Sequence, residues 1–169
     1  MPIMATGSLV SIHEYLSTSY RPDCDYLDGA VLERNLGEYD HARLQLAVGA
    51  YYFARRKQWG IDAVTEQRVQ VSATRFRIPD VCVIADAGPP EQIFRTPPLA
   101  CIEILSKDDR LSEMQDRVDD YLKFGVRYVW ILDPSRRKAW RCTDDGMREV
   151  AELRTEGPET IVPLADLFE

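Results

Sequence analysis

Two acidic residues stand inside the most apolar stretches of this 169-residue sequence. Glu103 lies between Ile102 and Ile104, and Asp80 directly precedes the apolar run 81–84. Burying a carboxylate is costly unless it is ion-paired or binds a metal. Two such acids on neighbouring strands would repel each other, and a hard divalent cation such as Mg²⁺ or Mn²⁺ would relieve that repulsion. The pair therefore predicts a divalent-metal site that activates water and clamps a scissile phosphate.

A second interpretation needs no metal. Each acid could pair with a nearby base, for which Arg75, Arg77 and Arg117 are available, or could point into solvent from the end of a sheet. An ion pair is sufficient to explain one acid alone. The presence of both acids favours the metal site.

The elements that must position these acids are strands and two long helices. Apolar spacing predicts amphipathic helices over Asp40–Gln58 and Ser112–Phe124, with polar residues such as Arg43 and Lys57 off the apolar stripe of the first. The strands predicted in this region are 63–71, 76–84, 99–105 and 128–132. Pro79 within the second of them indicates an edge or a bulge. The third is almost wholly apolar, which is typical of burial on both faces.

The flanking segments carry weaker signals. Ser11 and Glu14 resemble a capping box that opens a short helix to Leu16, and Asp28-Gly29 predicts a hairpin within 26–33. The C-terminal region predicts strands at 138–142 and 147–151 and a last segment at 161–168. Together the elements predict one α/β domain over residues 1–169, with a mixed central β-sheet flanked by α-helices.

Composition limits the class of protein. The net charge is −7, which disfavours tight non-specific binding of DNA unless basic groups gather on one face. No segment has the ~20 consecutive apolar residues of a membrane helix, and residues 1–9 lack the pattern of a signal peptide, so we expect a cytoplasmic protein without membrane contact. The four cysteines are widely separated, which favours reduced thiols over a zinc site or disulfides.

Several short motifs occur in an order that resembles a known family. They are Tyr26-Leu27-Asp28-Gly29, His41 at a helix start, Pro79-Asp80-Val81, Ile102-Glu103-Ile104-Leu105-Ser106, and the spaced series Tyr121, Gly125-Val126, Tyr128, Trp130 and Asp133-Pro134. In this order they resemble the Uma-two family of bacterial endonucleases, within the PD-(D/E)XK superfamily. The resemblance covers roughly residues 8–133. It implies a restriction-endonuclease-like core in which Asp80 and Glu103 are the two metal-binding acids.

The sequence departs from that superfamily at its lysine. Leu105 stands two residues after Glu103, where the superfamily has lysine, and Arg117 stands where the family often has lysine on the following helix. A guanidinium stabilises phosphate charge but is a poor base, because its pKa stays above ~12. Lys107 could substitute from the loop, although a solvated surface lysine is the simpler interpretation of that residue.

Other residues are candidates on weaker grounds. Glu33 ends the hairpin, and the resemblance makes it a possible third metal ligand, whereas Glu66 is equally typical of a solvent-facing strand residue. His41 could lie near the site, and Ser106 is better explained as a turn residue than as a nucleophile.

The leading functional hypothesis is a Mg²⁺- or Mn²⁺-dependent endonuclease that hydrolyses DNA phosphodiester bonds. Asp80 and Glu103 would hold the metal, and Arg117 or Lys107 would stabilise the phosphate. The alternative is a catalytically inactive scaffold or dimeric binding protein that kept the acids and lost the lysine. Binding of RNA or a nucleotide is a third option, but no glycine-rich phosphate loop supports a nucleotide site. A homodimer is expected by analogy alone, because nucleases that cut both strands often dimerise.

Overall fold

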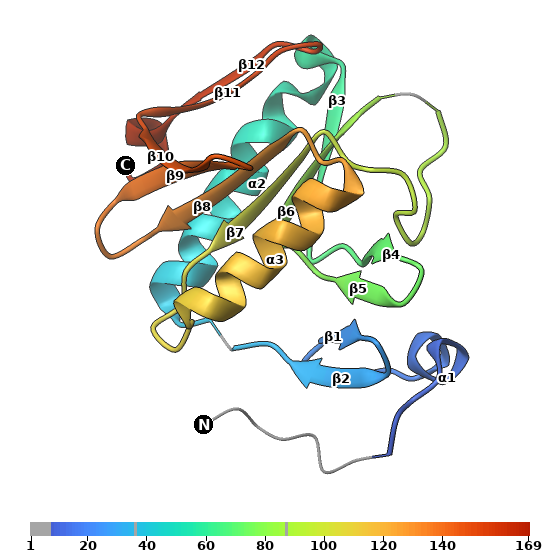
Figure 1. The fold of residues 1–169 in the computed structure, drawn as a ribbon. Helices are drawn as coiled ribbons and strands as arrows, with labels where there is room; N and C mark the ends of the chain where they lie inside the picture. Colours follow the sequence, from blue (N-terminus) through green and yellow to red (C-terminus); the bar gives the residue numbers. More distant parts are fainter. Residues whose placement is uncertain (1–7, 36, 87) are drawn as a thin grey trace.

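The computed structural model describes residues 8–35, 37–86 and 88–169. Two sheets, three α-helices and a C-terminal hairpin make up this part of the chain (Figure 1). In chain order the elements are α1 (Ile12–Ser17), β1 (Cys24–Leu27), β2 (Ala30–Glu33), α2 (Tyr39–Trp59), β3 (Ile61–Thr65), β4 (Val69–Ser72), β5 (Arg75–Arg77), β6 (Val81–Ala85), β7 (Ala100–Ile104), α3 (Leu111–Phe124), β8 (Tyr128–Asp133), β9 (Lys138–Thr143), β10 (Gly146–Val150), β11 (Glu152–Thr155), β12 (Thr160–Pro163) and a short 3₁₀ helix, η1 (Leu164–Leu167).

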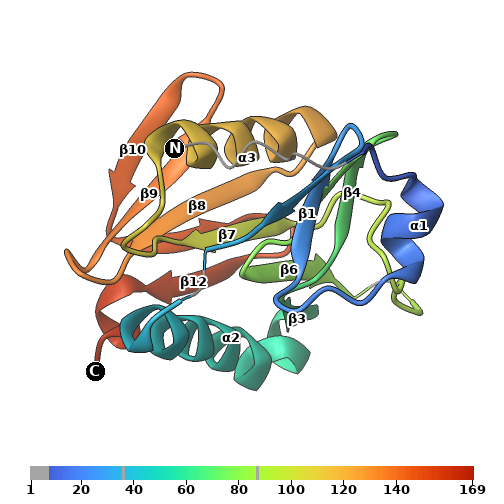
Figure 2. The same cartoon turned by 90° about the horizontal axis from the view of Figure 1, so that it is seen from below.

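The larger sheet is mixed, as the sequence predicts. Its strand order is β10-β9-β8-β7-β6-β3, in which β7 and β8 are parallel and the other neighbours are antiparallel. Figure 2 shows α3 on one face of this sheet and α2 on the other. The parallel step is made by α3, which crosses from the end of β7 to the start of β8. This confirms the α/β class and the mixed sheet between helices.

The central strands are buried on both faces. On the α2 face, Val81, Ile102 and Trp130 belong to one apolar cluster with the inner side of the helix. On the α3 face, Cys82 and Cys101 belong to a second cluster with the inner side of α3. Successive side chains of a strand point to opposite faces, so a nearly continuous apolar run fills both clusters. All four cysteines are buried and free, which agrees with the expected reduced thiols.

The smaller sheet has the order β2-β1-β5-β4 and carries α1. The expected hairpin joins β1 to β2 through Asp28 (φ 52°) and Gly29 (φ 99°), the positive angles that a tight two-residue turn needs. The expected cap of α1 is also present, since Ser11 Oγ accepts a hydrogen bond from the backbone N–H of Glu14 at 3.1 Å. Tyr15 of α1 packs on the aromatic cluster of this sheet.

Two predicted strands are wrong in the same way, because each is divided between the two sheets. The expected strand 63–71 is β3 and β4, separated by a turn at which Glu66 has a left-handed φ of 51°. The expected strand 76–84 is β5 and β6, separated by residues 78–80. Pro79 has no N–H to donate to a sheet, so the strand pairing stops beside it. The chain therefore crosses between the sheets immediately before Asp80.

The C-terminal prediction is incomplete. The last predicted segment, 161–168, consists of the end of β12 followed by η1. Strand β11, which the sequence did not indicate, pairs with β12 and contributes Leu153 to the core beside α2. Within the described ranges, no helix is long and apolar enough to cross a membrane.

Helix α2 differs from the amphipathic helix that its spacing predicts. Leu44, Val48 and Tyr52 face the sheet and are buried, as expected. Its outward side, however, also carries large apolar residues, of which Leu46 and Phe53 are exposed. The predicted inner apolar stripe is confirmed, whereas the outer apolar residues lie among basic residues that hide them in the sequence pattern.

Candidate active site

Strands β6 and β7 bring the two predicted acids together. They are antiparallel, and Val81 pairs with Ile102. One residue beyond this pair on each segment are Asp80, just before β6, and Glu103, within β7. The two acids therefore lie close together, and the charge of Asp80 acts on Glu103. The structure therefore brings together the two acids that the sequence singled out.

Asp80 is buried and surrounded by donors. Its Oδ1 accepts a hydrogen bond from Arg34 Nη2 at 3.0 Å, and its Oδ2 accepts one from the backbone N–H of Ile104 at 2.7 Å. His41 Nε2 lies 3.3 Å from the same Oδ2. Burial alone would raise the pKa of Asp80, but His41, Arg34 and the backbone N–H together hold it below its usual value. These contacts favour the ionised form of Asp80, and Asp80 in turn favours the protonated form of His41.

Glu103 lies in a different environment, although it is close to Asp80. It is 1% exposed, and its Oε1 accepts a hydrogen bond from the hydroxyl of Tyr121 on α3 at 2.5 Å. Its Oε2 is buried and has no hydrogen-bond partner within the described residues. Burial, and then the charge of Asp80, raise the pKa of Glu103 to about 8. The two neighbouring acids therefore have pKa values shifted in opposite directions, an arrangement that is common at functional sites.

Arg117 reaches this pair from α3. Its Nη1 lies 3.7 Å from Glu103 Oε2, and its Nε lies 3.7 Å from Oδ2 of Asp25. Asp25, on β1, is buried and receives a hydrogen bond from Arg77 at 3.0 Å. The predicted pairing of Arg117 with Glu103 is present, and Asp25 joins it as a third buried acid.

The structure does not bring Lys107 and Glu33 to the pair. Lys107 is exposed, and its Nζ lies 2.6 Å from Glu38 at the surface. Glu33 is exposed at the end of β2. Over residues 8–35, 37–86 and 88–169, no three His, Cys, Asp or Glu side chains are grouped closely enough to hold a metal. Glu66 contacts the site in two ways: its Oε1 lies 3.8 Å from Arg34 Nη1, and its backbone N–H donates a hydrogen bond to the carbonyl oxygen of Asp80 at 3.2 Å.

Sequence reasoning missed two members of the site. Arg34 follows directly after β2, and no sequence pattern showed that its side chain would reach Asp80, 46 positions away. Asp25 could have been found, because it stands between Cys24 and Tyr26 within a short β-rich run. This is the same signal, an acid within an apolar strand, that identified Glu103.

The residues present fit a divalent cation. Mg²⁺ is bound by one or two carboxylates and keeps several waters, so two neighbouring acids suffice. The unpartnered Oε2 of Glu103 is the kind of buried oxygen that a cation would satisfy. Arg34 already holds Oδ1 of Asp80, so a cation would compete with this guanidinium.

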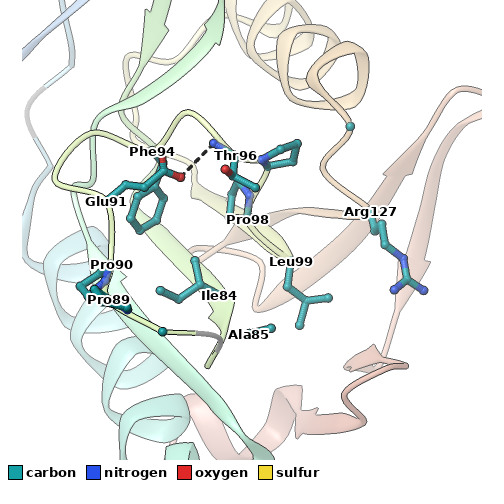
Figure 3. Close-up of a pocket in the computed structure, with 13 residues that line it drawn as sticks. Ile84, Ala85, Pro89, Pro90, Glu91, Phe94, Thr96, Pro98, Leu99 and Arg127 are labelled. Carbon is teal, nitrogen blue, oxygen red and sulfur yellow. Dashed lines mark hydrogen bonds between the residues drawn. The ribbon is translucent and has the colours of Figure 1, made fainter.

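A surface pocket of about 420 Å³ adjoins the site, and it is lined by His41, Ser106 and Lys107 among others. His41 connects this pocket to Asp80. A second pocket, of about 520 Å³, lies at the other end of β6, next to Ile84 and Leu99 (Figure 3). Neither acid lines either pocket, but the first pocket includes His41, which contacts Asp80, so it is the pocket that adjoins the acids.

Comparison with known proteins identifies a matching family and a similar solved structure. The Uma2 family, described as "Putative restriction endonuclease", matches residues 13–169. The fold is similar to the crystal structure of a "putative nuclease belonging to DUF820" from Anabaena variabilis ATCC 29413, with a TM-score of 0.80 and 20% sequence identity over 94% of this chain and 97% of that one.

A weaker match is to a chain of the DrdV–DNA complex, with a TM-score of 0.42 and 15% identity over 76% of this chain and 12% of that one. No curated protein matches the sequence. The first structure shows the restriction-endonuclease-like fold, and the family match spans nearly the whole sequence. The chain is therefore a member of the Uma2 family.

Proposed function

We propose that this protein is a divalent-metal-dependent nuclease that hydrolyses phosphodiester bonds of DNA at Asp80 and Glu103. The observation that carries the proposal is the neighbouring pair of buried carboxylates, one of which has a buried oxygen without a hydrogen-bond partner. Membership of the Uma2 family supports the same chemistry.

Asp80 and Glu103 would hold Mg²⁺ or Mn²⁺, which when bound lowers the pKa of water and stabilises charge on a phosphate. Glu103 must give up its proton for this role, because burial and Asp80 raise its pKa to about 8. We therefore expect metal binding to release a proton and to strengthen as the pH rises.

The positive groups around the acids suit an anionic substrate. Arg117 lies beside Glu103 and can neutralise charge on a phosphate, although its pKa is raised further and excludes a role as a base. His41 adds charge next to the pocket, since the hydrogen bond and the charge of Asp80 raise its pKa. These local cations offset the net charge of −7 where DNA would approach.

A cleavage assay tests the proposal. Supercoiled plasmid and single-stranded DNA are incubated with Mg²⁺ or Mn²⁺ and wild-type protein or the double variant Asp80→Asn/Glu103→Gln, with EDTA as a further control. Cleavage by the wild type alone is expected. If the double variant cleaves equally well, the activity lies elsewhere, and if neither protein cleaves, the nuclease proposal fails.

The second candidate function is a catalytically inactive DNA-binding or scaffold protein. Arg34 and Arg117 favour it, because they already compensate both acids without a metal, and Leu105 stands in place of the superfamily's lysine. In this case the wild type binds DNA without cutting it, and neither Mg²⁺ nor Mn²⁺ raises its melting temperature. A metal-dependent rise that is absent from the double variant excludes it.

A further inference from the structure

The outward side of α2 is an exposed apolar surface. Tyr39 is 77% exposed, Leu46 is 66% exposed and Phe53 is 51% exposed. These residues are spaced by seven, which is close to two helical turns, so they lie along one side of the helix. Ala42 and Ala50, also exposed, lie between them on the same side. We call the five residues the α2 stripe.

A helix that is apolar on both sides is normally covered on both sides. The inner side of α2 is covered by the six-stranded sheet, whereas α2 forms the outermost layer on its side of the molecule (Figure 2). Helix α3 is different, because Glu113, Asp116 and Lys123 give it a charged exterior. The α2 stripe therefore has the character of a contact surface, and the outside of α3 does not.

The α2 stripe is symmetric about its centre, so it can pack against the same stripe of a second copy of the chain. Leu46 stands at its centre, with Tyr39 seven positions before it and Phe53 seven positions after it. If two copies pack α2 against α2 in antiparallel orientation, a two-fold axis passes beside Leu46 of both. Tyr39 of one copy then lies near Phe53 of the partner subunit, and this contact occurs twice.

The charges of α2 favour the same orientation. Glu38 and Asp40 are at its N-terminal end, and Arg56 and Lys57 are at its C-terminal end. Antiparallel packing places each acidic end beside a basic end and also opposes the two helix dipoles. Parallel packing would place like charges together.

We infer that two copies of this protein form a homodimer through the α2 stripe, with a two-fold axis at Leu46. Such an interface is isologous, so the same patch serves both subunits. The dimer does not depend on the proposed function, but it has a consequence for it. His41 is five residues from Leu46, so the two His41 residues would be separated by about 15 Å along the helix axes. If the protein is a nuclease, the dimer carries two copies of the site, and their His41 residues are offset by this distance along the helices.

Sedimentation velocity over a range of protein concentrations tests the inference. Leu46→Glu places charge at the two-fold axis, and Leu111→Glu is the matched control, because Leu111 is 78% exposed on α3, outside the stripe. We expect wild type and Leu111→Glu to form the same dimer and Leu46→Glu to stay monomeric. Equal melting temperatures would show that all three are folded. A wild type that remains monomeric at high micromolar concentration overturns the inference, as does a Leu46→Glu variant that still dimerises.

Cysteine cross-linking tests the position of the axis. The four native cysteines are buried, so mild oxidation of Leu46→Cys acts on the new thiol. Only residues close to a two-fold axis can meet their own copies, because a disulfide needs Cα atoms about 4.4–6.8 Å apart. We expect Leu46→Cys to give a covalent dimer and Leu111→Cys to stay monomeric. Cross-linking of the Leu111 variant alone overturns the assignment. Neither experiment uses cleavage, so an inactive protein leaves the test intact.

Discussion

Arg117 stands 3.7 Å from the buried Oε2 of Glu103 without donating a hydrogen bond to it. The guanidinium is equally distant from Oδ2 of Asp25, so it lies between two buried carboxylates. Arg117 compensates the charge of Glu103 but does not occupy Oε2 with a hydrogen bond, so this oxygen is free to bind a cation. In the proposed reaction, a residue in this position would act on a phosphate by its charge and not by proton transfer.

Two replacements of Arg117 separate the effect of its charge on cleavage from its effect on the stability of the fold. We expect Arg117→Lys to keep or increase DNA cleavage, because an ammonium retains the charge and occurs there in the family. Arg117→Gln is expected to abolish cleavage and to lower the free energy of unfolding by about 3–5 kcal/mol, the cost of leaving a buried charge unpaired. Cleavage rates and urea unfolding of both variants measure this. Equal rates for Lys and Gln would remove Arg117 from the mechanism.

Arg34 is expected to compete with the metal. It occupies Oδ1 of Asp80, so a divalent cation must displace it or share the carboxylate with it. Arg34→Gln should tighten Mn²⁺ binding by about tenfold, which corresponds to about 1.4 kcal/mol. Electron paramagnetic resonance titration of free Mn²⁺ measures this without DNA. Arg154→Gln is the control, because Arg154 is paired with exposed acids elsewhere. Weaker binding in Arg34→Gln would mean that Arg34 supports the metal site.

The raised pKa of Glu103 predicts a pH dependence in metal-free protein. Between its ordinary value of 4.5 and about 8, the folded state keeps a proton that the unfolded state has released. Stability therefore falls as the pH rises through this window. His41, whose pKa is also raised, contributes with the same sign, and its stabilising effect is lost as the pH rises through its folded pKa.

Urea unfolding at pH 5 and pH 8 in EDTA isolates the contribution of Glu103. We expect the wild type to lose at least about 1.4 kcal/mol more than Glu103→Gln across this interval, the free energy of one pKa unit. The remaining slope of the variant then belongs largely to His41. Identical slopes for the two proteins would show that Glu103 titrates near its ordinary value.

Tyr121→Phe tests the hydrogen bond that positions Glu103. The hydroxyl is the only described donor to Oε1 in the folded chain, and its loss leaves a second buried oxygen unpaired. The free energy of unfolding should fall by about 1.5–3 kcal/mol, as for a hydrogen bond to a charged group, in chemical denaturation at pH 8. Since this bond also lowers the pKa of Glu103, the titration should move to higher pH. A variant with unchanged stability would show that the bond contributes little.

The sequence predicted the central pair because each acid interrupts an apolar run. That signal is local, and the pairing of two neighbouring strands is enough to bring the acids together. The positions of Arg34 and Asp25 depend instead on how the smaller sheet packs against the larger one. A long flexible side chain such as that of Arg34 carries no periodicity that would reveal its target.

The errors in the fold prediction also arise where the structure depends on how distant parts of the chain pack together. β-propensity is continuous across residues 63–71, but the left-handed turn at Glu66 depends on the sheet that each half joins. Pro79 indicates a break in the strand, but the sequence alone does not show that the break separates two sheets. The outward apolar residues of α2 lie among basic residues, so the sequence pattern reveals only the buried side of this helix. Tertiary context decided each of these cases.

Because the chain crosses between the two sheets at residues 78–80, the contacts of the site are complete only after both sheets have folded and docked. Asp80 and Glu103 are brought close together as soon as β6 pairs with β7, whereas Arg34 arrives only when the hairpin β1–β2 has docked. A chain with the large sheet formed and the hairpin undocked would hold two repelling acids with one of their counter-ions missing. Docking of the N-terminal hairpin should therefore be the step that compensates the charge of these buried acids. Divalent ions, which can compensate the same charge, should accelerate refolding or make it independent of that docking step.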